Sequence, residues 1–195
     1  MSEQSVEEML SRARILRQKG ENKKAIAAYK EVLEAYPDCV DALNEMGLIK
    51  IKIGEQDAAI EDFNRAIALR PDDPRAYSNR AEAFLTVGAF EEALDAAKDG
   101  LKAVPDSADL WAKKARALES MMKVQEAVDA YNEALKYDST DPEIWKSLAL
   151  CLDALEKWDE VARAYTIAAD LHKRRGEMRE YESCMKFAQM AKDSA

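Results

Sequence analysis

Few side chains in this chain have the types and spacing that catalysis or metal binding needs. The single histidine, His172, lies in the basic run LHKRR with no cysteine or serine partner at motif spacing. Cys39, Cys151 and Cys184 are far apart and form no CxxC pair, which is typical of a reducing compartment. No phosphate-binding loop, dinucleotide fingerprint or HExxH zinc motif occurs. We therefore predict a protein that is not an enzyme and has neither metal nor cofactor.

The same side chains have simpler structural roles. A positively charged histidine near the C-terminal end of a helix is stabilised by the helix dipole. Cys39 and Cys151 are expected to pack as small apolar residues. The formal net charge is −9, so the chain repels phosphate backbones and nucleic acid is not expected as a partner. The start, MSEQSVEEML, does not resemble a signal peptide, and no apolar run reaches the roughly 18 residues of a membrane span. A cytoplasmic protein without membrane contact is predicted.

The strongest pattern is a series of prolines. Pro37, Pro71 and Pro105 are each 34 residues apart, and the next step of 34 lands on Ser139. A repeat of this length indicates a helical solenoid, whose units bury their apolar faces only against their neighbours. With the proline at position 32, the repeats span residues 6–39, 40–73, 74–107, 108–141 and 142–175.

Small and aromatic residues recur in this register. Position 8 is small throughout: Ala13, Gly47, Ala81, Ala115 and Ala149. Position 24 is mostly aromatic: Tyr29, Phe63, Ala97, Tyr131 and Tyr165. Small residues let helices approach closely, so each repeat should be two packed helices. First helices are expected at about 6–19, 40–53, 74–87, 108–121 and 142–155, and second helices from about 22, 56, 90, 124 and 158.

The turn between the two helices needs a left-handed residue at position 15. Gly20, Gly54 and Gly88 supply one at little cost. Met122 and Glu156 occupy the same position in the last two repeats, so they must make this turn with a Cβ.

The pattern changes after Ala168. The fifth second helix should run to about residue 175, and a further helix is expected at about 177–192, with Met178, Tyr181, Met185 and Ala188 on one face. Its place at the end of the array favours a cap that covers the last repeat. A detached, partner-binding helix is the alternative.

The third repeat has a gap in its core pattern. Ala97 replaces the aromatic residue, and Gly100 lies inside the helix at a cost of about 1 kcal/mol relative to alanine. We expect this helix either to pack closer to its neighbours or to be the softest joint of the array.

Together these residues resemble the tetratricopeptide repeat (TPR) family over about residues 5–170. The second repeat is most similar, with Leu43, Gly47, Ala59, Phe63 and Pro71 at family positions. The resemblance implies an all-α, right-handed superhelical α-solenoid of five helix-turn-helix units plus the capping helix, forming a single TPR domain over residues 1–195. It also implies a scaffold or co-chaperone-like adaptor that binds a peptide or protein segment in a concave groove.

In the family, positions 2, 5, 6, 9, 12 and 13 of the first helices face the groove. The resemblance therefore implies these groove residues: Asn44, Leu48, Ile51, Arg75, Asn79, Glu82, Lys113, Arg116 and Lys146. The charges among them either recognise a carboxylate or pair with neighbouring acids such as Asp109 and Glu119. Of the five positions of the family's carboxylate clamp for chaperone tails, only Asn79 matches, so no tight binding of such tails is expected. A monomer or weak homo-oligomer is predicted, and self-association through the terminal helices is the alternative function.

Overall fold

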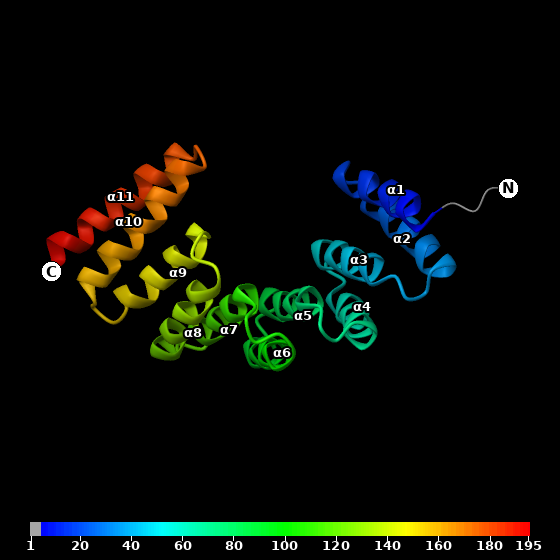
Figure 1. The fold of residues 1–195 in the computed structure, drawn as a ribbon, viewed down its shortest axis with the longest axis horizontal. Coiled ribbons are helices and arrows are strands. Elements are labelled where there is room, and N and C mark those ends of the chain that lie inside the picture. Colours follow the sequence, from blue (N-terminus) through cyan, green and yellow to red (C-terminus); the bar gives the residue numbers. More distant parts are fainter. Residues whose placement is uncertain (1–4) are drawn as a thin grey trace. The chain divides into compact units, whose positions relative to one another are not determined.

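The computed structural model describes residues 5–195, which form eleven α-helices and no strand (Figure 1). The helices are α1 Val6–Gln18, α2 Asn22–Ala35, α3 Val40–Lys52, α4 Gln56–Leu69, α5 Pro74–Thr86, α6 Phe90–Ala103, α7 Ala108–Ser120, α8 Val124–Tyr137, α9 Pro142–Asp153, α10 Trp158–Arg174 and α11 Met178–Ser194. The chain divides into two compact units, Met1–Val104 and Pro105–Ala195. Unit 1 thus contains α1–α6, and unit 2 contains α7–α11.

The repeat register correctly predicted where the helices begin. Every second helix starts at the expected residue, from α2 at Asn22 to α10 at Trp158. The expected N-caps are also present, because the side chains of Ser107, Asp73 and Asp141 each accept a hydrogen bond from the first turn that follows. The capping box of Ser5 with Glu8 holds the start of α1.

The turns inside the repeats have the predicted left-handed backbone. Gly54 has a φ of +86°, and Met122 and Glu156 have φ values of +60° and +57°. The last two residues therefore make the turn despite the steric cost of a Cβ in this region. The left-handed turn at position 15 therefore recurs in every repeat, although glycine does not.

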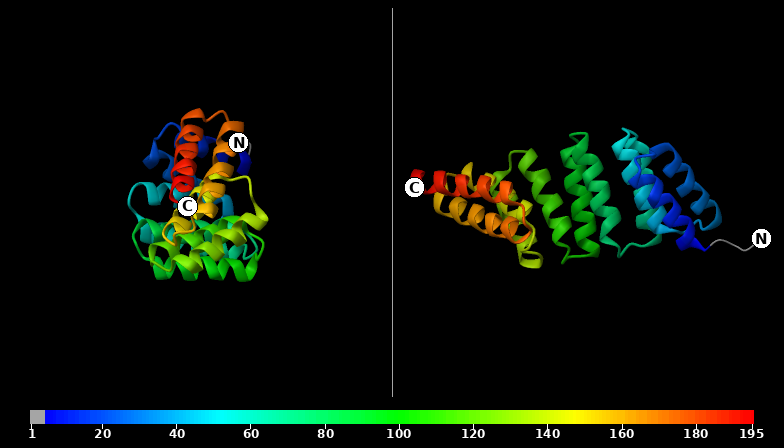
Figure 2. Two further views of the ribbon diagram at one scale, coloured as in Figure 1. Left: turned by 90° about the vertical axis from the view of Figure 1, so that its left-hand side faces the viewer. Right: turned by 90° about the horizontal axis from the view of Figure 1, so that it is seen from above.

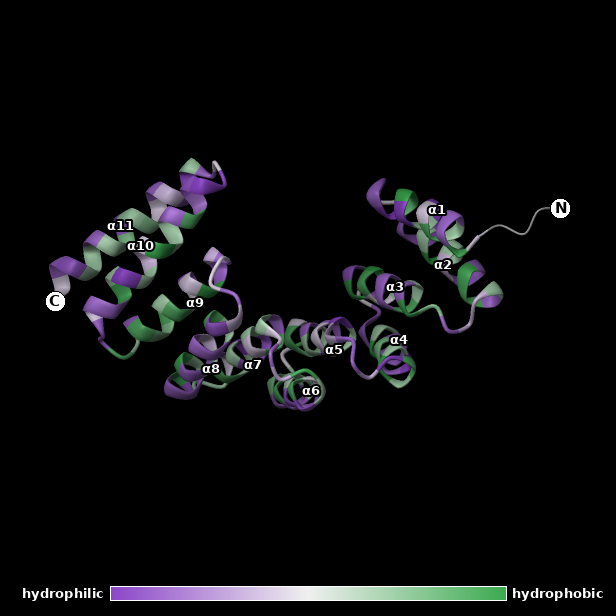
Figure 3. Cartoon of the chain, viewed as in Figure 1, coloured by the Kyte–Doolittle hydropathy of each residue, from purple (hydrophilic) through white to green (hydrophobic). Residues whose placement is uncertain are grey.

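Each helix has an apolar and a polar face (Figure 3), and consecutive helices within a unit pack side by side (Figure 2). The aromatic residues at position 24 are the largest buried side chains, among them Tyr29, Phe63 and Tyr131. A Cβ built on Gly47 would lie 2.5 Å from Cε1 of Phe63, so α3 and α4 approach too closely for alanine without movement.

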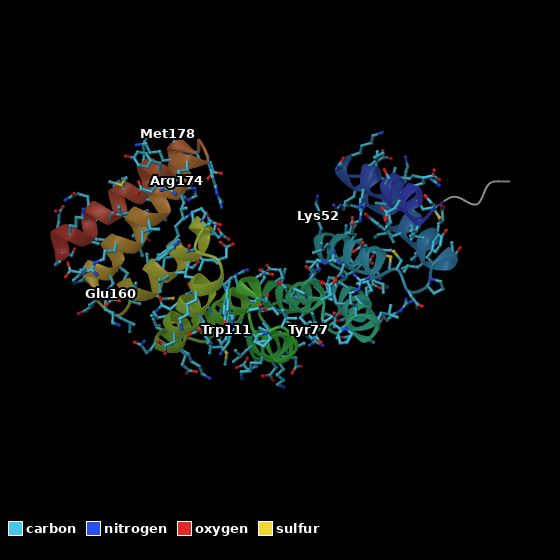
Figure 4. The ribbon with its side chains drawn as sticks, viewed as in Figure 1. Lys52, Tyr77, Trp111, Glu160, Arg174 and Met178 are labelled. Carbon is cyan, nitrogen blue, oxygen red and sulfur yellow. The ribbon has the colours of Figure 1, made fainter. Side chains whose placement is uncertain are left out.

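The carbonyl at position 32 has a role that the proline series alone did not reveal. The Tyr77 hydroxyl donates to the Pro71 carbonyl at 3.2 Å, and the Trp111 indole donates to the Pro105 carbonyl at 2.9 Å. Figure 4 labels both rings. Trp145 makes the same bond to the Ser139 carbonyl at 3.0 Å. Serine replaces proline in the fourth repeat without loss of this contact, because the main-chain oxygen is the acceptor.

The last helix, α11, packs along α10, so it is not detached (Figure 2). Its buried residues are Cys184, Ala188 and Ala191, and Phe187 stacks on Tyr165 with ring centroids 5.3 Å apart. The expected apolar face was partly wrong, because Met178 and Met185 are exposed. The small residues pack closest to α10, which places the long methionine side chains at the edge of the contact.

Candidate functional site

The residues expected to face a groove lie on the first helices of the repeats, which are α1, α3 and α5 in unit 1 and α7 and α9 in unit 2. We call the surface formed by their positions 2, 5, 6, 9, 12 and 13 the first-helix face of each unit. The predicted residues Asn44, Leu48, Ile51, Arg75, Asn79 and Glu82 belong to unit 1. Lys113, Arg116 and Lys146 belong to unit 2.

In unit 1, a carboxylate on this face is enclosed by charged and polar groups. Glu45 accepts a hydrogen bond from Nε of Arg14 at 2.7 Å and one from the Tyr29 hydroxyl at 2.6 Å. The guanidinium of Arg17 lies 3.4 Å from the same carboxylate. Burial and then the Glu45 carboxylate raise the pKa of Tyr29, so its hydroxyl stays a donor. We call these four residues the Glu45 cluster.

A second ion pair on unit 1 engages Arg75. Its guanidinium lies 2.6 Å from Asp73 and 2.9 Å from Asp41. The hydrogen bond from Arg75 holds the pKa of Asp73 below its usual range. Arg75 therefore fastens the start of α5 to α3 and already has two carboxylate partners.

The remaining predicted residues of unit 1 divide into buried and exposed ones. Asn44 is buried, donates to the Val40 carbonyl at 3.2 Å, and accepts from the Asn79 amide at 3.1 Å. It positions Asn79 and lies below the surface, contrary to the expectation that it faces a groove. Ile51 packs against the core around Phe63, and Glu82 is half-buried. Leu48 is the most exposed apolar member.

Unit 2 has a hollow on its first-helix face with a volume of about 220 Å³. Lys113 and Arg116 of α7, Tyr131 of α8 and Ser147 of α9 belong to its lining. The other lining residues are Ala108, Asp109, Ala112, Asp138, Asp141, Glu143 and Ile144. We call this hollow the Ser147 pocket. It brings together two of the three predicted bases of unit 2.

The contacts inside the Ser147 pocket are mixed. The Lys113 ammonium lies 3.9 Å from Asp109 and its side chain is largely buried. The Tyr131 hydroxyl donates to Glu119 at 2.7 Å and is hydrogen-bonded to Ser147. Burial and then Glu119 raise the pKa of Tyr131. The third base, Lys146, is outside the pocket lining and pairs with Glu143 at 3.0 Å.

The two sites are related by the repeat register. Arg14, Tyr29 and Glu45 recur 102 residues later, or three repeats on, as Arg116, Tyr131 and Ser147. The sequence prediction named Arg116 but not Tyr131 as a site residue, because it took position 24 only as core. The offset of three repeats from Arg14 and Tyr29 is the signal that would have found it.

His172 and the cysteines have structural surroundings. His172 is buried with Nδ1 2.6 Å from Glu177 and Nε2 3.7 Å from Glu143, so it joins the end of α10 to its neighbours. Burial raises the pKa of Cys151 to about 12, which keeps the thiol protonated. Over residues 5–195, no three His, Cys, Asp or Glu side chains gather as they would around a metal ion. Nor does any helix in that range have the length and apolarity of a membrane span.

Comparison with family models covers most of the described chain. The Psidin N-terminal TPR repeats region matches residues 83–190, a TPR repeat model matches 47–88, and a tetratricopeptide repeat model matches 6–51. The chain belongs to the tetratricopeptide repeat family. A comparison with curated protein sequences finds no match.

Solved structures agree on the TPR fold. A thermophilic TPR protein from Thermus thermophilus has a TM-score of 0.75 at 21% identity, over 93% of this chain and 99% of that one. MamA has a TM-score of 0.70 at 24% identity, over 85% and 96%. PilF of Pseudomonas aeruginosa has a TM-score of 0.72 at 16% identity, over 92% and 88%. These likenesses establish an all-helical α-solenoid, as the repeat pattern predicted. TPR proteins are generally non-catalytic interaction modules, so the family supports a protein-interaction scaffold in general.

Proposed function

We propose that this TPR chain is a non-enzymatic adaptor that holds a peptide or protein segment on its first-helix face, with the Ser147 pocket as the main anchoring point. The observation that carries the proposal is the pocket itself, because it is a hollow of about 220 Å³ that gathers Lys113 and Arg116 beside an aromatic hydroxyl. Specific binding sites are typically concave with a few converging polar groups.

On the first-helix face of unit 1, Arg14, Arg17 and Arg75 are paired with carboxylates of their own unit. Leu48 gives an exposed apolar contact, and Lys52 extends from the end of α3 (Figure 4). Unit 1 therefore supplies secondary contacts in this proposal. The cytoplasmic location and the absence of nucleic acid and membrane partners stay predictions from the sequence.

A photo-crosslinking experiment tests the site. A photoreactive amino acid is placed at Ala112, which lines the pocket, and separately at Asn132, which is exposed on α8 outside it. In lysate of the source cells we expect covalent adducts from the Ala112 position and far fewer from Asn132. The charge reversal Lys113→Glu/Arg116→Glu should remove the Ala112 adducts. Equal adduct yields at both positions, or adducts that survive the charge reversal, would contradict the proposed site.

Self-association through the terminal helices is the second candidate, and one observation favours it. The outer surface of α1 and α2 has a hollow of about 760 Å³ beside Ile15, which is 48% exposed. The equivalent Ile49, one repeat later, is 2% exposed because it packs with α1 and α2. A second copy of the chain is the occupant in this candidate. Light scattering coupled to size-exclusion chromatography decides: a concentration-dependent dimer that Ile15→Glu abolishes supports it, and a monomer throughout excludes it.

A further inference from the structure

Unit 1 has a further hollow at the edge where its helices turn back, with a volume of about 610 Å³. The turn between α3 and α4, with the start of α4, supplies part of its lining, and the end of α5, with the turn to α6, supplies the rest. We call this the turn-edge hollow. It shares no lining residue with the first-helix face, so it is a separate surface from the proposed anchoring site.

Apolar side chains of the turn-edge hollow are open to solvent. Val87 is 54% exposed, and Ile60 and Phe84 line the hollow while packing partly against the core. Val87 stands at position 14 of its repeat, where the first repeat has Lys19. Apolar side chains that converge on a concave surface are typical of a binding site.

Hydrogen bonds hold both turns of the hollow in place. The amide of Glu55 donates to the Lys50 carbonyl at 2.8 Å, and the amide of Ala89 donates to the Phe84 carbonyl at 3.0 Å. The Lys50 ammonium also lies 2.6 Å from the buried Asp62, which joins the end of α3 to α4. The hollow is therefore formed before a partner arrives, and this lowers the entropy cost of binding.

The charges around the hollow are acidic. Glu55 and Asp57 line it, and Glu91 lies in the first turn of α6. No lysine or arginine occurs in residues 53–64 or 81–97, which contain both turns. Within the described residues 5–195, the side chains of these three acids form no ion pair or hydrogen bond. Acids in a first turn favour the helix dipole, but that role does not account for the exposed apolar side chains between them.

The same repeat positions in unit 2 lack this combination. Position 16 is Glu55 and Ala89 in unit 1, whereas it is Lys123 and Lys157 in unit 2. The acidic, apolar edge is therefore a property of the second and third repeats of this chain and not of the repeat in general.

We infer that the turn-edge hollow binds a segment of a partner protein in which a large apolar side chain is flanked by lysine or arginine. The apolar side chain packs against Val87 and Phe84, and the flanking cations pair with Glu55 and Asp57. Charge complementarity selects this ligand, since an acidic segment is repelled by the same edge. The inference goes beyond the proposed function because both the surface and the ligand chemistry differ.

The test selects a random library of displayed peptides on the intact chain and maps each enriched peptide by nuclear magnetic resonance. Peptides of the inferred class should shift the amide resonances of residues 54–60 and 84–89. They should share an apolar residue flanked by lysine or arginine. Their binding should weaken as the salt concentration rises, because the carboxylates are exposed.

Two variants separate the charge from the apolar contact. Glu55→Gln/Asp57→Asn keeps the shape of both side chains and removes their charge, so these peptides should bind about tenfold more weakly. Val87→Ser removes apolar contact and should weaken binding about fivefold. All three positions are exposed, so the variants should fold as the natural chain does.

Matched controls change the same kinds of residue elsewhere. Glu126→Gln/Asp159→Asn removes two first-turn acids of unit 2, and Leu69→Ser replaces an apolar residue that is 41% exposed at the end of α4, outside the hollow. Neither control should weaken binding. Lys113→Glu/Arg116→Glu in the Ser147 pocket should also leave this class of peptide unaffected, which keeps the two proposals independent.

Three results would overturn the inference. One is a library from which no enriched peptide shifts the resonances of the hollow. Another is a set of peptides that bind there without basic residues, or whose affinity survives Glu55→Gln/Asp57→Asn. The third is a shift of the same resonances with protein concentration in the absence of peptide, which would assign the hollow to a second copy of the chain.

Discussion

The Glu45 cluster and the Ser147 pocket show two uses of one framework. Both have an arginine at position 9 of a first helix and a buried tyrosine at position 24 of the following helix. In unit 1, the next repeat contributes a carboxylate, and the charges are satisfied inside the protein. In unit 2 the carboxylate that meets the tyrosine comes instead from Glu119 of the same repeat, and Ser147 leaves a hollow. The two sites therefore differ at two positions around the tyrosine, because Arg17 and Glu45 of unit 1 correspond to Glu119 and Ser147 of unit 2.

The largest expected effect is the loss of the closed carboxylate. Glu45→Ala leaves the buried Tyr29 hydroxyl without its acceptor and removes the partner of Arg14 and Arg17, so we expect a loss of about 2–3 kcal/mol in the free energy of unfolding. Glu119→Ala should cost less, about 1 kcal/mol, because Tyr131 keeps its contact with Ser147. Urea denaturation of both variants measures the difference. Equal losses of unfolding free energy would show that Tyr29 and Tyr131 depend equally on their carboxylate partners.

The next effect concerns the small residue at position 8, which is Gly47 in unit 1 and Ala115 in unit 2. Alanine at 47 gains about 1 kcal/mol of helix propensity. Overpacking costs about 1–3 kcal/mol. Because the new Cβ would lie 2.5 Å from the Phe63 ring, we expect this cost to exceed the gain in helix propensity. We expect Gly47→Ala to lower the unfolding free energy by about 1–2 kcal/mol, and Gly47→Ala/Phe63→Leu to recover part of it. A Gly47→Ala variant as stable as the natural chain in thermal melts would contradict this packing.

The N-caps Asp73 and Asp141 provide a smaller contrast. Asp73 is followed two residues later by Arg75, and Asp141 by Glu143. We expect Asp73→Asn to cost about 1–2 kcal/mol near neutral pH and Asp141→Asn less than about 0.5 kcal/mol, because asparagine still caps the helix and only the first variant also loses an ion pair. Because Arg75 lowers the pKa of Asp73, its contribution is present above the ordinary aspartate pKa and is lost as the pH falls through the lowered value. Thermal melts from neutral to acidic pH should show the gap between the two variants closing. A gap that widens in acid would exclude this ion pair as its cause.

The sequence predicted the fold closely because helix starts, turns and caps are local. Met122 and Glu156 adopt φ > 0 as the register required, and the N-caps are formed by the expected residues. The site was less predictable, because burial and pairing depend on neighbouring repeats. Asn44 is drawn below the surface by Val40 and Asn79, and Arg75 is held by two aspartates. Family positions predict which way a side chain points, but they do not predict which neighbouring side chain it contacts.

The smallest expected effect tests the gap in the third repeat. Ala97 and Gly100 replace bulk in α6, and Ala81, Ala96 and Ala97 form a small cluster with Phe84 beside it. By contrast, α4 has Phe63 and α8 has Tyr131, both buried. The helix glycine alone costs about 1 kcal/mol, which corresponds to about fivefold more frequent opening. We therefore expect amide hydrogens of residues 90–104 to exchange about fivefold faster than those of 56–70 and of α8. Exchange as slow as in 56–70 would show that the alanine cluster compensates by closer packing, so that α6 is no softer than the aromatic-filled helices of either unit.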